Sequence, residues 1–218
     1  MKADIDEALR YLGVRRPDET LRLQMQRIAD ELSETLQPRY SWRVFSLQQT
    51  AEGWLVPELA LRISGRSADR MLQTSHHLII LAATLGSAFD AKLRELQHRS
   101  MAQAVMTDAC GSAFIEAVCN QAEQEIAARL PEQYLTDRFS PGYGDLPLAL
   151  QSALLAAVDA ERRTGITLLE SQLMNPSKSV TALIGVSDQP QQARIRGCAY
   201  CQLAADCMLR KRGVSCGS

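Results

Sequence analysis

Four of the six cysteines in this 218-residue chain stand close together at its C-terminal end, in the spacing Cys198-x2-Cys201-x5-Cys207-x8-Cys216. Four thiolates suit a tetrahedral zinc ion or an iron–sulfur cluster, and Cys198 and Cys201 could bind one metal from a single turn of chain. The basic residues at 210–212 would favour the thiolate form. The alternative is a tail of reduced thiols, because the spacing matches no standard motif. The sequence leaves both open.

A second group of residues that could bind a ligand is Arg138-Phe139-Ser140-Pro141-Gly142-Tyr143, which has the pattern Arg-x-x-x-Gly-Tyr. Pro-Gly is ordinary turn chemistry, and a tyrosine beside a turn often serves packing. Taken alone, the pattern therefore predicts a turn and not a binding site.

The pattern continues beyond a predicted helix with Thr164-Gly165, Leu168-Leu169-Glu170-Ser171, Met174-Asn175-Pro176 and Ser179-Val180. In order, spacing and residue type, the stretch from Arg138 to Gly185 resembles the activation domain of cobalamin-dependent methionine synthase. Free-standing relatives of that domain are more similar still, from about Leu59 onward. The shared segments are Thr84-Leu85-Gly86, Asp108-Ala109 with Glu116-Ala117, Ser140 to Pro147, Lys178 to Ala182 and a Cys-rich C-terminus.

The resemblance implies a binding site for S-adenosylmethionine. Arg138 would form a bidentate ion pair with its carboxylate, and Gly142 would let the backbone approach the ligand closely. Tyr143 would lie near the reacting centre and the corrin. The chain departs from the fused domains after the Gly-Tyr pair, where Gly144-Asp145-Leu146-Pro147 replaces Pro-x-x-Pro-Asp-His. It also has no tyrosine between Ser179 and Gly185.

The resemblance also implies a function, the reactivation of a cobalamin-dependent methionine synthase that lacks its own activation domain. Oxidised cob(II)alamin on that partner would be reductively methylated, with S-adenosylmethionine as methyl donor and electrons from a separate donor. The partner could also be another corrinoid protein, and a metal cluster in the tail could pass the electron. The chain itself needs no acid–base catalytic residue for this, and no nucleophile–His–acid pattern is present.

The sequence has two other candidate functions. One is a Cys-rich metal-binding or electron-transfer accessory protein for another corrinoid protein, for which the tail is the only feature. The other is an ordinary S-adenosylmethionine-dependent methyltransferase. The sequence disfavours it, because no Gly-rich strand–loop–helix with a following acidic residue appears.

Charge, aromatic content and the length of apolar runs limit the classes of partner that we expect. The formal net charge is −1 and aromatic residues make up 5%, so we expect no nucleic-acid partner. The longest apolar run, Leu78 to Leu85, is too short to span a bilayer. The first residues are charged where a signal peptide would be apolar. We therefore expect a cytoplasmic protein with no membrane partner.

The elements that would position these residues are mixed helices and strands without a regular βαβ rhythm, which predicts an α+β fold. With the resemblance, this becomes a mixed, mainly antiparallel sheet flanked by helices. We expect an N-terminal helical segment (1–40), an α+β core (41–190) and a Cys-rich tail (191–218). The expected helices are 4–12, 18–36, 67 onward, 87–99, 101–130 and 146–161, and the expected strands lie within 41–64, 77–85, 166–169 and 179–186.

Several single residues have an expected place. Asp4, Ser67 and Ser87 read as helix N-caps. Small residues near Gly111 in the long helix suggest close approach of another element. Cys110 and Cys119 should be buried. His76 and His77 should point to opposite faces of a strand, which disfavours a shared metal site. For Asp108 and Glu116 we expect a solvated helix surface.

Overall fold

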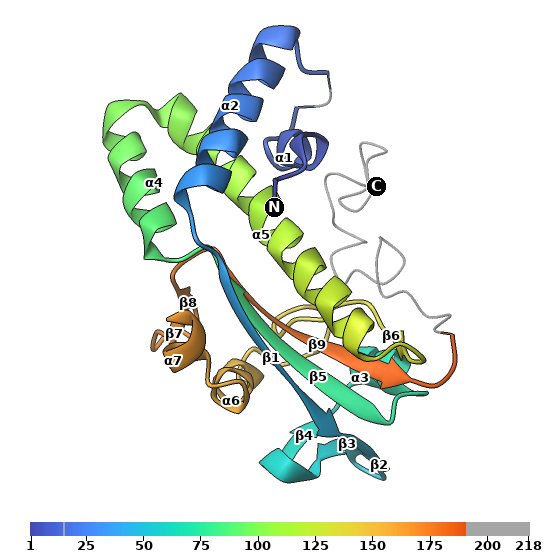
Figure 1. The fold of residues 1–218 in the computed structure, drawn as a ribbon. Helices are drawn as coiled ribbons and strands as arrows, with labels where there is room; N and C mark the ends of the chain where they lie inside the picture. The colour runs from blue at the N-terminus through green and yellow to red at the C-terminus, as the bar shows by residue number, and fades with distance from the viewer. Residues whose placement is uncertain (15, 191–218) are drawn as a thin grey trace. The chain divides into compact units, whose positions relative to one another are not determined.

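The computed structural model describes residues 1–14 and 16–190 (Figure 1). This part of the chain forms two compact units, each built from separate segments. The boundaries between them fall inside strands β1 (Arg39–Ser46), β5 (His77–Thr84) and β9 (Ser179–Ser187), so each strand contributes residues to both units. The helical unit comprises Met1–Ser41, Ala82–Arg129 and Val158–Val180, and the strand unit comprises Trp42–Leu81, Leu130–Ala157 and the described residues from Thr181 onward.

The helical unit is organised around α5 (Met101–Arg129), the long helix predicted from the sequence. Helices α1 (Ile5–Tyr11), α2 (Glu19–Thr35) and α4 (Ser87–Arg99) all pack on it (Figure 1). Their common core is apolar and closed to water, which supplies the main driving force for this packing. Its largest fully buried side chains include Met25, Leu32, Phe89 and Phe114.

Two local predictions in this unit are confirmed. Asp4 is the N-cap of α1, and its carboxylate accepts from the amides of Asp6 (2.8 Å) and Glu7 (3.1 Å). Gly111 allows the close approach of α4, because a Cβ there would lie 2.3 Å from Cζ of Phe89. A larger residue at position 111 would therefore push the two helices apart.

The four-stranded sheet has the order β1–β5–β9–β6, with β6 at Tyr134–Leu135 (Figure 1). The strands are antiparallel to their neighbours. The amide of Leu85 donates to Lys178 O (3.0 Å) just beyond one end of the β5–β9 pair, and that of His76 donates to Val186 O (2.9 Å) at the other. β5 is buried along nearly its whole length, as its continuous apolar run predicts. The expected α+β fold, with a mainly antiparallel sheet flanked by helices, is confirmed.

The strand unit also holds a small antiparallel sheet of β2 (Gln48–Thr50), β3 (Gly53–Val56) and β4 (Leu61–Ile63). Strands β3 and β4 are separated by a 3-10 turn at Pro57–Leu59, and α3 (Arg66–Leu72) packs on β3. Helix α6 (Leu150–Ala157) is joined to β9 by a buried hydrogen bond, in which the Thr181 hydroxyl donates to Oε1 of Gln151 at 2.9 Å.

The single helix predicted from Leu146 to Glu161 is wrong. The chain forms α6 and then the short α7 (Ala160–Thr164), separated at Asp159, whose φ of +53° is left-handed. In the strand unit, the carbonyl of Ala157 at the end of α6 accepts from Arg43 at 3.2 Å. In the helical unit, the carbonyl of Val158 accepts from the Ser41 hydroxyl at 2.9 Å. Side chains of β1 thus take the carbonyls that a continuous helix would have used.

Helix α5 is the longest helix of the described residues. In residues 1–14 and 16–190, no helix combines the length and the apolar character that crossing a membrane requires.

Candidate functional site

The Arg-x-x-x-Gly-Tyr pattern lies on a tight turn of the strand unit, residues 138–146, called the Gly–Tyr turn below. Gly142 (φ +87°) and Gly144 (φ +55°) both occupy the left-handed region that favours glycine. Three backbone bonds shape the turn: Tyr143 N to Ser140 O (3.2 Å), Gly142 N to Leu146 O (2.9 Å) and Leu146 N to Tyr143 O (3.1 Å). The predicted turn is therefore present, and its glycines are required by its conformation.

Both ends of the Gly–Tyr turn are fixed in the protein interior. Phe139 is 6% exposed and forms a two-bond bridge with Leu183 of β9, with N···O distances of 3.0 and 2.8 Å. Leu146 is 2% exposed, whereas Tyr143 at the tip is 71% exposed. A rigidly based turn that displays an aromatic ring to solvent can offer that ring to a ligand or a partner.

Asp145 connects the tip of the turn to α3. Its carboxylate accepts from the amides of Arg66 (2.7 Å) and Ser67 (3.1 Å), the first two residues of that helix. A hydrogen bond from the Ser67 side chain is the largest cause that lowers the pKa of Asp145, and the two amides add to it. Because the first amides of a helix have no partner within the helix, a carboxylate is well placed there.

The predictions that Ser67 and Ser87 cap helices are wrong. The N-cap residues of α3 and α4 are Gly65 and Gly86, and neither has a side chain that could accept a bond. In α3 the capping carboxylate comes from Asp145, which is distant in the sequence. A rule that considers only neighbouring residues has no means of finding such a cap.

The structure places Arg138, Gly142 and Tyr143 on this one turn. Arg138 is half-buried and directly precedes the Phe139 bridge, so its backbone is well fixed. Gly142 is exposed, and a Cβ there would meet only Cδ1 of Leu148, at 3.4 Å. The surface over Gly142 is thus open to the close approach of another group.

The later part of the pattern lies in the helical unit. Gly165, with φ +81°, ends α7, and a hairpin of β7 (Thr167–Leu168) and β8 (Met174–Asn175) follows. Leu169 and Leu173 near the hairpin tip are 50% and 60% exposed. The Asn175–Pro176 peptide bond is cis.

Lys178, directly before β9, forms a polar cluster that the sequence analysis did not find. Its ammonium lies 2.9 Å from Oδ1 of Asp108 and 2.8 Å from the Ser112 hydroxyl, both on α5. The Lys178 side chain is only 18% exposed. Asp108, expected on the solvated surface of its helix, is therefore one half of an ion pair. The sequence signal that could have pointed to Lys178 is the Lys178 to Ala182 segment, which the chain shares with the free-standing relatives.

Comparison with known proteins identifies the family and the fold. The family model "Vitamin B12 dependent methionine synthase, activation domain" matches residues 71–211, well over half of the chain. The chain belongs to this family. A crystal structure of the MetH reactivation domain bound to AdoHcy has a similar fold, with a TM-score of 0.62 at 16% identity over 99% of this chain and 86% of that one. A search of curated proteins found no significant match.

Beyond the activation-domain pattern, the cysteines fall into two groups. Cys110 and Cys119 are buried, as predicted, and burial raises the pKa of Cys110 to about 12, so that its thiol is unreactive. The four predicted metal ligands, Cys198, Cys201, Cys207 and Cys216, lie outside the described residues. Within the described part of this activation-domain relative, no three His, Cys, Asp or Glu side chains are grouped to hold a metal.

His76 and His77 are closer together than the sequence predicts. Their ring centroids are 4.6 Å apart in an edge-to-face arrangement. The alternation rule fails because β5 begins at His77, so that His76 belongs to the preceding turn. His76 Nε2 lies 3.6 Å from Oδ1 of Asp188.

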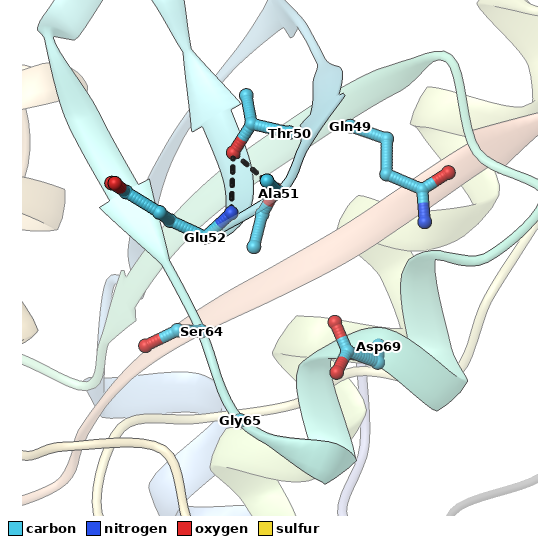
Figure 2. A pocket seen from close by; sticks show the side chains of 8 residues that line it. Gln49, Thr50, Ala51, Glu52, Ser64, Gly65 and Asp69 are labelled. Carbon is cyan, nitrogen blue, oxygen red and sulfur yellow. Dashed lines mark hydrogen bonds between the residues drawn. The ribbon is translucent and has the colours of Figure 1, made fainter.

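A shallow polar hollow of about 420 Å³ lies between the β2–β3 turn and the start of α3. Figure 2 shows Gln49 and Asp69 on opposite sides of it. Its acidic groups are already engaged, since Asp69 accepts from Trp54 Nε1 at 3.0 Å and Glu52 pairs with Arg62. None of the residues predicted to bind a ligand lines this hollow.

Proposed function

We propose that this chain binds S-adenosylmethionine at the Gly–Tyr turn and reactivates a cobalamin-dependent methionine synthase. The reaction supported would be reductive methylation of cob(II)alamin, with S-adenosylmethionine as methyl donor. Membership of the activation-domain family supports the general role. The observation that carries the site is the turn itself, whose ends are buried while Tyr143 is 71% exposed.

The residues of the turn fit an amino-acid-like ligand. The guanidinium of Arg138 can pair in a bidentate manner with a carboxylate. Gly142, open above its Cα, lets the ligand approach the backbone. Tyr143 provides a ring face and a hydroxyl for orientation. The corrinoid would supply the methyl-accepting metal, and this chain would hold the methyl donor and keep water away.

The partner in this proposal is a methionine synthase that lacks its own activation domain, and the alternative partner is another corrinoid protein. An electron donor must also take part, because the cobalamin has to be reduced before it accepts the methyl group. We place the encounter in the cytoplasm. A Cys-rich electron-transfer accessory protein for another corrinoid protein remains the rival prediction.

The ligand is tested by calorimetric titration of S-adenosylmethionine into wild type and Arg138→Ala. We expect the variant to bind more weakly by roughly 2–4 kcal/mol, because it loses an ion-paired hydrogen bond that the bound ligand would shield from water. Arg62→Ala is the matched control, since Arg62 is an exposed arginine of the same unit that pairs with Glu52. Equal affinities for wild type and Arg138→Ala would remove Arg138 from the site.

The role is tested with a separate methionine synthase that lacks an activation domain and is held in the cob(II)alamin state. Added chain, reductant and S-adenosylmethionine should together restore turnover and remove the cob(II)alamin absorbance. Omitting S-adenosylmethionine is the control. Full restoration without the chain would contradict the proposal.

The tail is included as a metal site formed by Cys198, Cys201 and Cys207, with Cys216 as a fourth candidate, and this part rests on sequence alone. Metal analysis and visible spectroscopy of anaerobically purified protein should find zinc or an iron–sulfur cluster in stoichiometric amount. The double variant Cys198→Ser/Cys201→Ser should lose it. Wild-type protein without metal would mean that electrons reach the corrinoid by another route.

A further inference from the structure

We propose that Asp145 is a positioning residue that holds Tyr143 in its working place by fastening the Gly–Tyr turn to the first turn of α3. The inference rests on the function proposed above for Tyr143. Asp145 would touch neither the methyl donor nor the corrin. It would act only through the place it gives to the aromatic ring.

The contact is a specific one. Helix α3 begins after Gly65, which has no side chain to cap it, and the Asp145 carboxylate takes that place. One carboxylate oxygen lies 2.7 Å from the Arg66 amide and the other lies 3.1 Å from the Ser67 amide. The Ser67 side chain also hydrogen-bonds to the carboxylate. Both oxygens are therefore used, which fixes the direction as well as the position of Asp145.

Glycines on both sides make this contact possible. A Cβ on Gly65 would lie 3.0 Å from the Asp145 carboxyl group, and a Cβ on Gly144 would lie 2.7 Å from the Ser67 hydroxyl. Both glycines also have positive φ, +117° and +55°. Each glycine thus lies closer to a side chain of the other segment than a Cβ would allow, so α3 and the turn are fitted to each other.

The backbone hydrogen bonds of the turn hold its shape and its two ends. The three backbone bonds within the turn give it shape but join it only to itself. The buried Phe139 and Leu146 hold its ends. Tyr143 stands between two glycines, which have the widest conformational freedom of all residues. Asp145, two positions along, is therefore the link from the tip to another element through which the place of Tyr143 is set.

Without Asp145, the exposed ring should spread over several positions and lose alignment with its target. Misplacement of a reacting geometry by about 1 Å can cost on the order of a hundredfold in rate. We expect a smaller effect here, a fall of about tenfold in the rate of reactivation at saturating S-adenosylmethionine. Arg138 lies outside the contact between Asp145 and α3, on the segment fixed by Phe139. Affinity for S-adenosylmethionine should therefore change by less than about threefold.

The experiment compares Asp145→Ala, Asp145→Asn and Ser67→Ala with wild type. Amide hydrogen exchange at Tyr143 and Leu146 reports the order of the turn, and reactivation at saturating S-adenosylmethionine reports its use. Exchange should rise most in Asp145→Ala. It should rise least in Asp145→Asn, which keeps one acceptor oxygen and should recover part of the rate. Ser67→Ala removes only the hydroxyl bond and should fold without difficulty.

Asp18→Ala is the matched control, because Asp18 caps α2 in the same manner by accepting from the Leu21 amide at 2.7 Å. It should lower stability without changing exchange in the Gly–Tyr turn. Unchanged exchange in all three test variants would overturn the proposal. So would a rate loss in Asp18→Ala equal to that in Asp145→Ala. Exchange can be measured even if the wild-type chain fails to reactivate any partner, so failure of the proposed function is recognised separately.

Discussion

The Gly–Tyr turn and the segment from Thr164 to Val180 together carry the family pattern, but they differ in how far their polar side chains are exposed to solvent. In the turn, Tyr143 is 71% exposed on a tip between two glycines. In the later segment, Lys178 is 18% exposed and faces Asp108 and Ser112. The first arrangement exposes an aromatic ring that a ligand or partner could contact. The second is an ion pair within the helical unit, which we expect to stabilise the fold. Matching one sequence pattern therefore does not give every residue in it the same kind of role.

The largest expected effect is on the rate of reactivation, which should depend on the Gly–Tyr turn. Tyr143→Ala should lower the rate of reactivation by roughly ten- to a hundredfold, because the aligning ring is lost. Its stability should stay within about 0.5 kcal/mol of wild type, as for most exposed positions. Reactivation assays and thermal melts on the same protein samples check this. A variant that is clearly destabilised, yet reactivates normally when folded, would make Tyr143 a packing residue and remove the contrast.

Lys178→Ala should show the opposite behaviour. It removes a half-buried ion pair and a hydrogen bond, which should lower the free energy of unfolding by about 1–3 kcal/mol. Lys2→Ala is the control, because Lys2 pairs with Asp30 but is 73% exposed, and such pairs contribute about 0–1 kcal/mol. Chemical denaturation of the three proteins measures the difference. Equal losses for the two lysine variants would show that the Lys178 cluster is an ordinary surface ion pair.

Two glycines offer a finer comparison. Gly142 and Gly165 have similar φ values, +87° and +81°, and neither has an atom that would clash with a Cβ. Substitution by Ala should therefore cost about 1–2 kcal/mol of backbone strain at each site. Only Gly142→Ala should also weaken binding of S-adenosylmethionine in calorimetry. Equal affinities in the two variants would place the ligand away from the turn.

The smallest expected effect is a dependence on pH. The folded state lowers the pKa of Asp145 below its ordinary 3.8, chiefly through the bond from the Ser67 side chain. Its contribution to stability is therefore present above pH 3.8 and is lost as the pH falls further, through the folded-state pKa. The difference in melting temperature between wild type and Asp145→Asn should shrink in acid. The difference for Gly165→Ala should stay constant, and a constant Asp145→Asn difference would contradict the pKa shift.

Much of the fold could be predicted because its signals are local. The continuous apolar run of β5 and the length of α5 are visible in the chain itself, as is the Pro-Gly turn before Tyr143. The family pattern added the antiparallel sheet. Local signals also misled, since the apolar run after Leu146 looked like one helix but is broken at Asp159, where β1 side chains take the helix carbonyls.

The sequence by itself determined which residues form the turn, and therefore that Arg138, Gly142 and Tyr143 lie on it together. Only the tertiary structure decided what holds that turn. Asp145 and the Arg66 amide are 79 positions apart, and Lys178 and Ser112 are 66 apart. The physical reason is the range of the interactions. Turn and helix preferences act between near neighbours, whereas a carboxylate finds an unpaired helix amide only after the whole chain has packed.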